Sequence, residues 1–166
     1  MSEIEFPNRQ ILSHDVPHWV EEGSVFFITV NCAERGRVQL TEPKIAAGVL
    51  EAARFYHERH LWHIQLILLM PDHFHALMSF PLDSVMADLF KSWKRYTART
   101  LGIAWQDGFF DHRLRNENEV TEKHFYIRQN PVRKGLCEKQ DDWPHQMHWA
   151  NGPLIVAGEN RVTTQR

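Results

Sequence analysis

The chain has 166 residues, enough for one domain with a substantial buried core but not for two large ones. Its apolar runs are far shorter than the roughly 20 residues that span a bilayer, and its acidic N-terminus lacks a signal-peptide pattern, so we expect a cytoplasmic protein. The two cysteines show no CxxC spacing, which argues against a disulfide framework or a zinc ribbon.

Charge is distributed unevenly along the chain. The net charge of −2 by itself argues against a nucleic-acid partner, because phosphate binding normally needs a basic surface. From Lys91 to Lys134, however, ten basic residues accompany five acidic ones, so this segment carries +5 and the remainder −7. The asymmetry favours a face built for a polyanion, although a solvated helix surface of mixed charge explains it equally well.

The first half of the chain predicts a strand and then a helix. Residues 25–30 are rich in β-branched and aromatic side chains and end at Asn31, which indicates a strand. A helix is expected to follow from a cap at Thr41, because Pro43 suits a first helical turn. Its apolar residues recur at helical spacing, at Ile45, Val49, Ala52, Ala53 and Tyr56.

The middle of the chain predicts a β-hairpin. Residues 62–70 form a nearly continuous apolar run, Pro71 and Asp72 form a turn, and residues 73–80 form the second strand. A second helix is expected from a cap at Asp83 to a stop at Gly102.

A short strand is expected within residues 104–114, followed by a third helix. This helix should start near Asn116 or Asn118 and end around Asn130, because Pro131 disfavours helical geometry in the residue before it. The order of elements fits an α+β protein with a ferredoxin-like sandwich, in which helices cover one face of an antiparallel sheet. We expect residues 1–24 to be an extension, residues 25–139 the domain, and residues 140–166 a partly disordered tail.

His73 and His75 lie two residues apart on a predicted strand, so their side chains point to one face while Phe74 points to the other. Two imidazoles that converge in this way can bind a metal, and imidazole suits Mn, Fe, Ni, Cu or Zn better than Mg. The pair alone is weak evidence, because ordinary hydrogen-bonded histidines give the same pattern in a chain with eleven of them. A third ligand is needed.

Tyr126 and Asn130 lie four residues apart on the third predicted helix, and therefore on one face. They present a phenol and an amide together, which makes Asn130 a candidate third ligand. A packed tyrosine and a helix-ending asparagine are the ordinary alternatives. Of the three tyrosines, Tyr56 lies on an apolar stripe and Tyr96 among basic residues where it could stack on a base, so only Tyr126 has a candidate ligand one turn away.

Three segments of the chain together resemble a known family. Residues 69–77, Leu-Met-Pro-Asp-His-Phe-His-Ala-Leu, closely resemble the metal-binding strand of single-tyrosine HUH transposases. Residues 125–136, with the pattern Tyr-Ile-x-x-Asn-Pro-Val-x-x-Gly-Leu, resemble the nucleophile helix of the subgroup called REP-associated tyrosine transposases. Residues 105–115 also look like this subgroup. The resemblance runs from about residue 25 to 136, and three motifs in the right order are far more specific than any one.

The resemblance implies a fold, a site and a substrate. It implies the HUH form of the ferredoxin-like fold, with His73, His75 and Asn130 as ligands of a divalent metal, Mg²⁺ or Mn²⁺. Tyr126 matches the nucleophile, which would displace a 3′-hydroxyl and leave a 5′-phosphotyrosine that a free 3′-hydroxyl can later reverse. The family's substrates are hairpins of repeated extragenic palindromes, so we expect a single-stranded or hairpin DNA partner, and neither a membrane nor a small-molecule substrate. A monomer is expected, with a dimer as the alternative.

DNA contacts are expected from two sets of basic residues. Four recur along the second predicted helix, and two alternate on the short strand after it: Lys91, Lys94, Arg95 and Arg99, then Arg113 and Arg115. Four aromatic residues could stack on unpaired bases, although core packing explains them at least as well: Trp93, Trp105, Phe109 and Phe110.

Two other classes of function remain open. The first is a catalytically silent protein that binds hairpins as a regulator and cannot nick DNA. The second is a metal-dependent hydrolase with a water nucleophile. For this hydrolase the metal motif offers only the Asp72 carboxylate, which lies in the turn and out of phase with the histidines.

Overall fold

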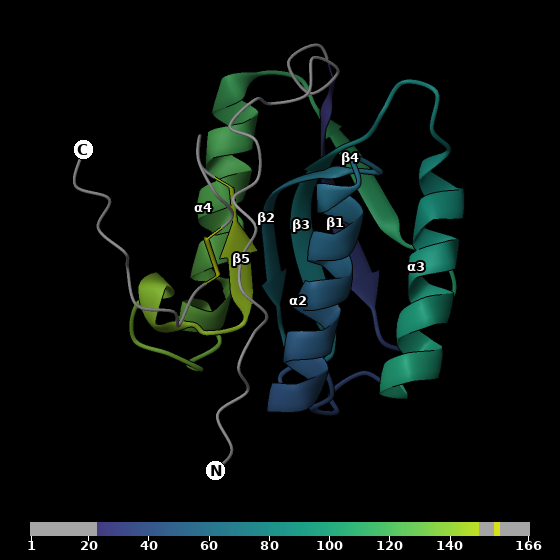
Figure 1. Ribbon diagram of the computed structural model, residues 1–166. Helices are drawn as coiled ribbons and strands as arrows, with labels where there is room; N and C mark the ends of the chain where they lie inside the picture. The colour runs from purple at the N-terminus through teal and green to yellow at the C-terminus, as the bar shows by residue number, and fades with distance from the viewer. Residues whose placement is uncertain (1–22, 150–154, 157–166) are drawn as a thin grey trace, which may run out of the picture.

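A sheet of six strands, in the order β4-β1-β3-β2-β5-β6, forms the centre of the computed structural model, which describes residues 23–149 and 155–156 (Figure 1). All neighbouring strands are antiparallel. The elements in chain order are β1 (Val25–Asn31), α2 (Pro43–Glu58), β2 (His63–Leu69), β3 (His73–Ser79), α3 (Met86–Leu101), β4 (Phe110–Leu114), α4 (Glu117–Arg133), the 3₁₀ helix η1 (Gln140–Asp142), β5 (Gln146–His148) and β6 (Ile155–Val156). The predicted α+β class with an antiparallel sheet is confirmed.

The two faces of the sheet carry separate apolar cores. On one face, residues such as Ile28 and Phe74 pack with α2 and with Phe90 and Trp93 of α3. On the other face, an apolar cluster joins α4 to the sheet; its buried members are Phe27, Leu66, Leu68, Met70, Leu77, Leu114, Ile127 and Trp143. The structure therefore differs in one respect from the predicted sandwich with helices on one face, because α4 covers the other face of the sheet. Alternate residues of the central strands are apolar on both sides, so α4 buries Ile127 against the second side.

The hairpin of β2 and β3 fixes the two histidines beside β1. In the antiparallel register, His75 lies opposite Thr29, and His73 lies opposite Asn31. Paired residues of neighbouring strands point to the same face. His73 and His75 therefore share the face that α4 covers, as their spacing predicts, while Phe74 is buried on the other face.

Helix α4 starts where the sequence predicts but ends later. The Asn116 side chain caps it by accepting a 2.9 Å hydrogen bond from Glu119 N–H. The predicted end near Asn130 is wrong, because the helix continues through Pro131 to Arg133. The turn after Pro131 remains hydrogen-bonded despite the missing proline N–H: Lys134 N–H donates to the Asn130 carbonyl at 3.1 Å, and Leu136 N–H donates to the Pro131 carbonyl at 2.9 Å.

The caps of the other two helices also differ from the predictions. The carboxylate of Glu42, not the hydroxyl of Thr41, accepts a 3.0 Å hydrogen bond from Ile45 N–H and caps α2. Helix α3 starts at Met86 with Val85 as its cap rather than Asp83, and no side chain bonds there. Gly102 ends α3 as predicted, in the left-handed conformation (φ 70°) that glycine adopts without strain.

The ordered structure continues past residue 139, where the sequence predicts the domain to end. Strand β5 pairs with β2, and the buried Trp143 donates a 2.9 Å hydrogen bond to the Leu69 carbonyl. A three-residue strand is too short to show a period, so β5 could not be predicted from alternation. The predicted extension before residue 23, and the tail apart from β6 after residue 149, lie outside the described residues. No helix within the described part is long and apolar enough to cross a membrane.

Candidate active site

Three of the predicted site residues meet where α4 crosses β3. The rings of His73 and His75 lie 4.8 Å apart between centroids, and the Tyr126 ring lies 6.2 Å from that of His75. Tyr126 is 40% exposed, so its phenol is accessible to a large substrate. Asn130 lies one turn further along α4 and is 6% exposed.

Each histidine is held through its Nδ1 atom. His73 Nδ1 lies 2.6 Å from Asp72 Oδ1, and His75 Nδ1 lies 2.8 Å from the hydroxyl of Thr29. An ionised carboxylate can only accept, so the proton of His73 is on Nδ1 and the lone pair is on Nε2. Within the described residues no hydrogen bond occupies the Nε2 atom of either ring. Both rings can therefore present Nε2 to a common ligand.

Burial keeps both imidazoles neutral. Burial lowers the pKa of His75 to about 3, helped by the nearby charges of His73, Arg133 and Lys123. Burial also lowers the pKa of His73, although the Asp72 carboxylate opposes that change. Neutral imidazole is the form that binds metals. Both residues are therefore in the ligating form at neutral pH.

The donor set fits a divalent metal. It combines two neutral imidazoles with the side-chain amide of Asn130, which is nearly buried and makes no hydrogen bond to other described residues. The amide atoms are not fully enclosed, so the amide oxygen is open to solvent or to a ligand. No group of three His, Cys, Asp or Glu residues in the described ranges could hold a metal by itself. An amide oxygen as third ligand lies outside that set and suits a hard cation.

Two basic side chains flank the Tyr126 ring. The Arg133 guanidinium carbon lies 4.4 Å from the ring centroid, and Lys123 Nζ lies 5.2 Å from it. Lys123 Nζ is also 4.8 Å from the centroid of Phe27, whose ring stacks on His75. Positive charge beside an accessible phenol can bind a phosphate group next to it.

These two flanking residues were not among the predicted site residues. Lys123 and Arg133 lie three residues before and seven after Tyr126, so helical spacing alone places them on its face. Asp72 was considered only as the carboxylate of an alternative hydrolase, and its contact with His73 makes it a neighbour of the site. No sequence pattern marked Thr29 as a site residue, because its contact with His75 depends on the pairing of β1 with β3.

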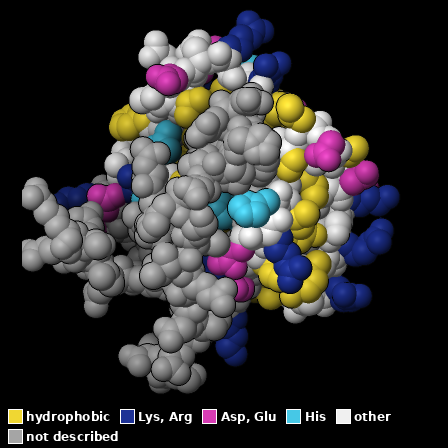
Figure 2. All heavy atoms as spheres, turned by 45° about the horizontal axis from the view of Figure 1, so that its top comes forward, with side chains coloured by type: hydrophobic (Ala, Val, Ile, Leu, Met, Phe, Trp, Pro, Cys, Tyr) yellow, Lys and Arg dark blue, Asp and Glu magenta, His cyan; other side chains and the backbone are white. Residues whose placement is uncertain are grey.

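The basic residues predicted on α3 lie on the opposite face of the sheet from Tyr126. Lys91, Arg95 and Arg99 are exposed, and Lys and Arg side chains line the right-hand edge of Figure 2, on the side where α3 lies. Lys94 differs from them, because its ammonium donates to the carbonyls of Gln106 (2.6 Å) and Gly108 (2.8 Å). Lys94 therefore anchors the loop before β4.

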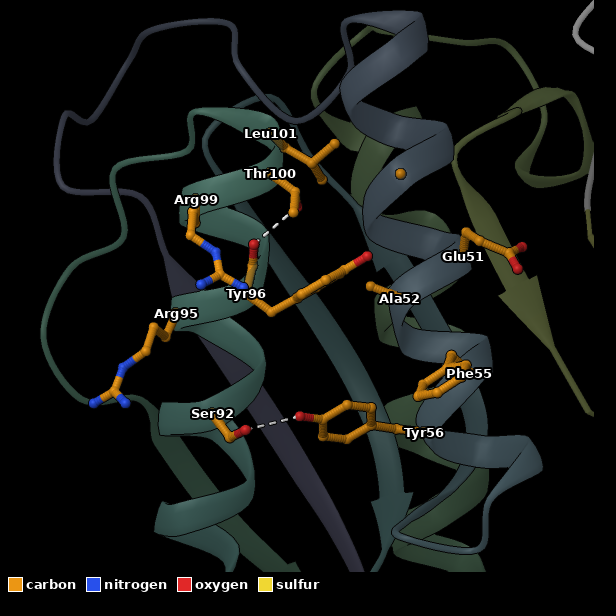
Figure 3. A pocket seen from close by; sticks show the side chains of 11 residues that line it. Glu51, Ala52, Phe55, Tyr56, Ser92, Arg95, Tyr96, Arg99, Thr100 and Leu101 are labelled. Atoms are coloured by element: carbon orange, nitrogen blue, oxygen red, sulfur yellow. Dashed lines mark hydrogen bonds between the residues drawn. The ribbon is translucent and has the colours of Figure 1, made fainter.

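Arg95 and Arg99 line a groove of about 650 Å³ between α2 and α3. In Figure 3 the Tyr96 side chain points across this groove towards Ala52, while both arginines point away from α2. A hydrogen bond of 3.0 Å between Tyr56 Oη and Ser92 Oγ bridges the two helices. Tyr56 and Tyr96 are thus both remote from the histidine pair.

The remaining predicted contacts lie on the edge strand β4 and directly after it. Arg113 and Arg115 are exposed and, with His112, line a shallow hollow of about 440 Å³. Of the four aromatic residues predicted as stacking candidates, three pack in the core: Trp93, Trp105 and Phe109. Phe110 is 56% exposed and lies 6.2 Å from Phe27, beside the site. It is the one of the four that can receive an unpaired base there.

Comparison with known proteins finds two curated relatives. A REP-associated tyrosine transposase of Escherichia coli K12 is 25% identical over 128 residues, which cover 74% of this chain and 75% of the relative. A putative REP-associated tyrosine transposase of Haemophilus influenzae is 26% identical over 144 residues, which cover 75% and 79% of the two chains. No family model matches the sequence.

A solved structure has a fold similar to that of this chain. It is a REP-associated tyrosine transposase bound to a REP hairpin, with a TM-score of 0.66 and 25% sequence identity. The match covers 88% of this chain and 82% of that one. The shared fold and the two relatives agree with the family resemblance of the three sequence motifs.

Proposed function

Because the chain resembles the REP-associated tyrosine transposases in sequence and fold, we propose that it is an enzyme of this single-tyrosine HUH class, which nicks and rejoins single-stranded DNA at REP-type hairpins. Tyr126 is the proposed nucleophile. The proposed ligands of a divalent metal, Mg²⁺ or Mn²⁺, are His73, His75 and Asn130. The observation that carries this proposal is the position of the accessible Tyr126 ring beside two neutral histidines and two cations.

The covalent step follows from the chemistry of a phenol. The Tyr126 oxygen loses its proton and forms a bond to the scissile phosphorus as the bond from phosphorus to the 3′-oxygen breaks. The 3′-oxygen leaves as a hydroxyl, so that overall one proton passes from the phenol to the leaving oxygen. The phosphotyrosine conserves the energy of the broken bond, so another 3′-hydroxyl can reverse the step and join DNA. A divalent metal, when bound, supplies positive charge that polarises the phosphate.

The protein's own residues would position the phosphate. Lys123 and Arg133 offer charged donors next to the phenol, and the fixed α4 helix holds these groups in one orientation. Phe110 offers a surface on which an unpaired base can stack. Arg113 and Arg115 can track the backbone along the edge strand. Lys91, Arg95 and Arg99 would contact a part of the hairpin that reaches the other face, whereas Lys94 would act indirectly by holding its loop.

Two alternatives are less well supported. A silent hairpin-binding regulator has no need of an accessible tyrosine beside two histidines with free Nε2 atoms. A hydrolase needs a base for its water, but both oxygens of Asp72 are occupied by His73, Gly36 and Arg35. A monomeric state is proposed from the family resemblance, and a cytoplasmic location from the sequence pattern described above.

Metal-dependent cleavage is the direct test of this function. A single-stranded oligonucleotide with a REP-type hairpin and labelled flanks should be cut at one position when Mg²⁺ or Mn²⁺ is present, and not in EDTA. One labelled product should remain attached to protein on a denaturing gel. A fully duplex oligonucleotide of the same sequence serves as the control. A retarded complex without any cut, in either metal, would favour the silent regulator.

Loss of the flanking charges should slow cleavage. Lys123→Gln and Arg133→Gln each remove one charged donor, for which about 1.5–3 kcal/mol is typical, so we expect a fall in rate of roughly tenfold or more. Lys44→Gln makes the same change at an exposed position of α2 and should cut at the normal rate. Single-turnover rates measure the effect. Rates equal to that of Lys44→Gln would show that the two cations do not contact the reacting phosphate.

A further inference from the structure

The carboxylate of Asp72 is enclosed by three donors from two segments of the chain. Oδ1 lies 2.6 Å from His73 Nδ1, and Oδ2 accepts from Gly36 N–H at 2.8 Å. The Arg35 Nε atom lies 3.3 Å from Oδ2, and the Asp72 side chain is only 14% exposed. Both oxygens therefore already have partners within the protein.

The backbone of the Pro71–Asp72 turn is held independently of this carboxylate. Cys32 N–H donates to the Asp72 carbonyl at 2.8 Å, while Gln39 and Leu40 N–H donate to the Pro71 carbonyl at 2.8 and 3.0 Å. The hairpin closes through Met70 N–H and the His73 carbonyl at 2.8 Å. A change confined to the side chain should therefore leave the turn in place.

We propose that Asp72 is a positioning residue, which fixes the proton of His73 on Nδ1 so that Nε2 points its lone pair at the metal. The inference rests on the proposed metal site and adds a residue to it that is not a ligand. A carboxylate that bonds the second nitrogen of a ligating histidine sets the tautomer and ring orientation, and its loss typically costs 10–100-fold in metal affinity. Arg35 also donates to the Asn31 side chain, which lies opposite His73 in the sheet.

An amide cannot replace this carboxylate. In Asp72→Asn, one orientation turns the NH₂ group toward Gly36 N–H and Arg35, where donors already occupy both places. The other orientation turns it toward His73, whose Nδ1 must then accept, so the ring proton moves to Nε2 and blocks the ligating atom. The second orientation is favoured, because no two donors face each other once the ring proton has moved to Nε2. The variant therefore tests the tautomer rather than the fold.

Two measurements on metal-free and Mn²⁺-loaded protein test the inference. In metal-free protein, long-range ¹H–¹⁵N NMR should find the His73 proton on Nδ1 in the wild type and on Nε2 in Asp72→Asn. Titration followed by the EPR signal of free Mn²⁺ should show 10–100-fold weaker binding for the variant, and cleavage should recover at high Mn²⁺. Asp83→Asn, the same change in an exposed loop, should match the wild type in both measurements.

The outcomes separate this inference from the proposed function. An unchanged His73 tautomer, or wild-type Mn²⁺ affinity in Asp72→Asn, would overturn the positioning role while leaving the metal site intact. If Asp72→Asn lowered the melting temperature and weakened hairpin binding as well as Mn²⁺ binding, Asp72 would have a role in folding. That result would also overturn the positioning role. If Mn²⁺ bound the wild type without selectively broadening the His73 and His75 NMR signals, the metal site itself would be wrong.

Discussion

Replacement of Tyr126 by phenylalanine is expected to abolish both DNA cleavage and the covalent protein–DNA adduct. The change removes one oxygen and keeps the ring, so the contacts of that ring with Phe27 and His75 should persist. Melting temperature and hairpin affinity should therefore stay close to the wild-type values. A denaturing gel of the reaction with labelled hairpin DNA measures the adduct and the cut together.

The other two tyrosines provide matched controls. Tyr96 lies in the groove between α2 and α3, and Tyr56 bonds Ser92 there, both on the opposite face of the sheet from the histidines. Tyr56→Phe and Tyr96→Phe should therefore still form the adduct. Nicking by Tyr126→Phe at the wild-type rate would mean that water or another tyrosine is the nucleophile.

Replacement of either histidine of the pair should abolish metal-dependent cleavage. A metal supplies several kcal/mol of transition-state stabilisation, so His73→Ala and His75→Ala are each expected to cut at least about a hundredfold more slowly. Hairpin binding in EDTA should be largely spared, because most of the affinity comes from contacts with phosphates elsewhere. Single-turnover cleavage with Mn²⁺, beside a mobility-shift assay in EDTA, separates the two effects.

His112 offers the control for this experiment. It is an exposed histidine on β4, and its register with Phe27 places it on the same face of the sheet, outside the pair. His112→Ala should keep metal-dependent cleavage. Full activity in His73→Ala or His75→Ala would remove the metal from the proposed mechanism.

Much of the fold could be predicted because its signals are local. Apolar runs, alternation and helical spacing located β1, the hairpin of β2 and β3, and all three α-helices. The position of α4 on the second face was missed, because a strand that is apolar on both sides does not reveal which helix covers which side. The continuation of α4 past Pro131 was missed because proline is tolerated where the following turn supplies its own bonds.

The site was only partly predictable for a related reason. Spacing alone predicted that His73 lies beside His75 and that Tyr126 lies beside Asn130. The contact between these two pairs depends on where α4 crosses β3, and only the family resemblance implied that contact. The hydrogen bonding of Asp72 depends on Gly36, which is distant in sequence. The anchoring role of Lys94 depends on two carbonyls of a later loop. Such contacts leave no periodic pattern in a sequence.

The most direct test of the central claim is to identify the residue that becomes linked to DNA. Trypsin would separate the three tyrosines, because Tyr126 falls in the peptide 124–128, Tyr96 in 96–99 and Tyr56 in 55–59. After reaction with a hairpin oligonucleotide and Mn²⁺, followed by nuclease and trypsin digestion, mass spectrometry should find a 5′-linked nucleotide on peptide 124–128. A nucleotide on peptide 96–99 or 55–59, or cleaved DNA with no modified peptide, would contradict the assignment of Tyr126 as the nucleophile.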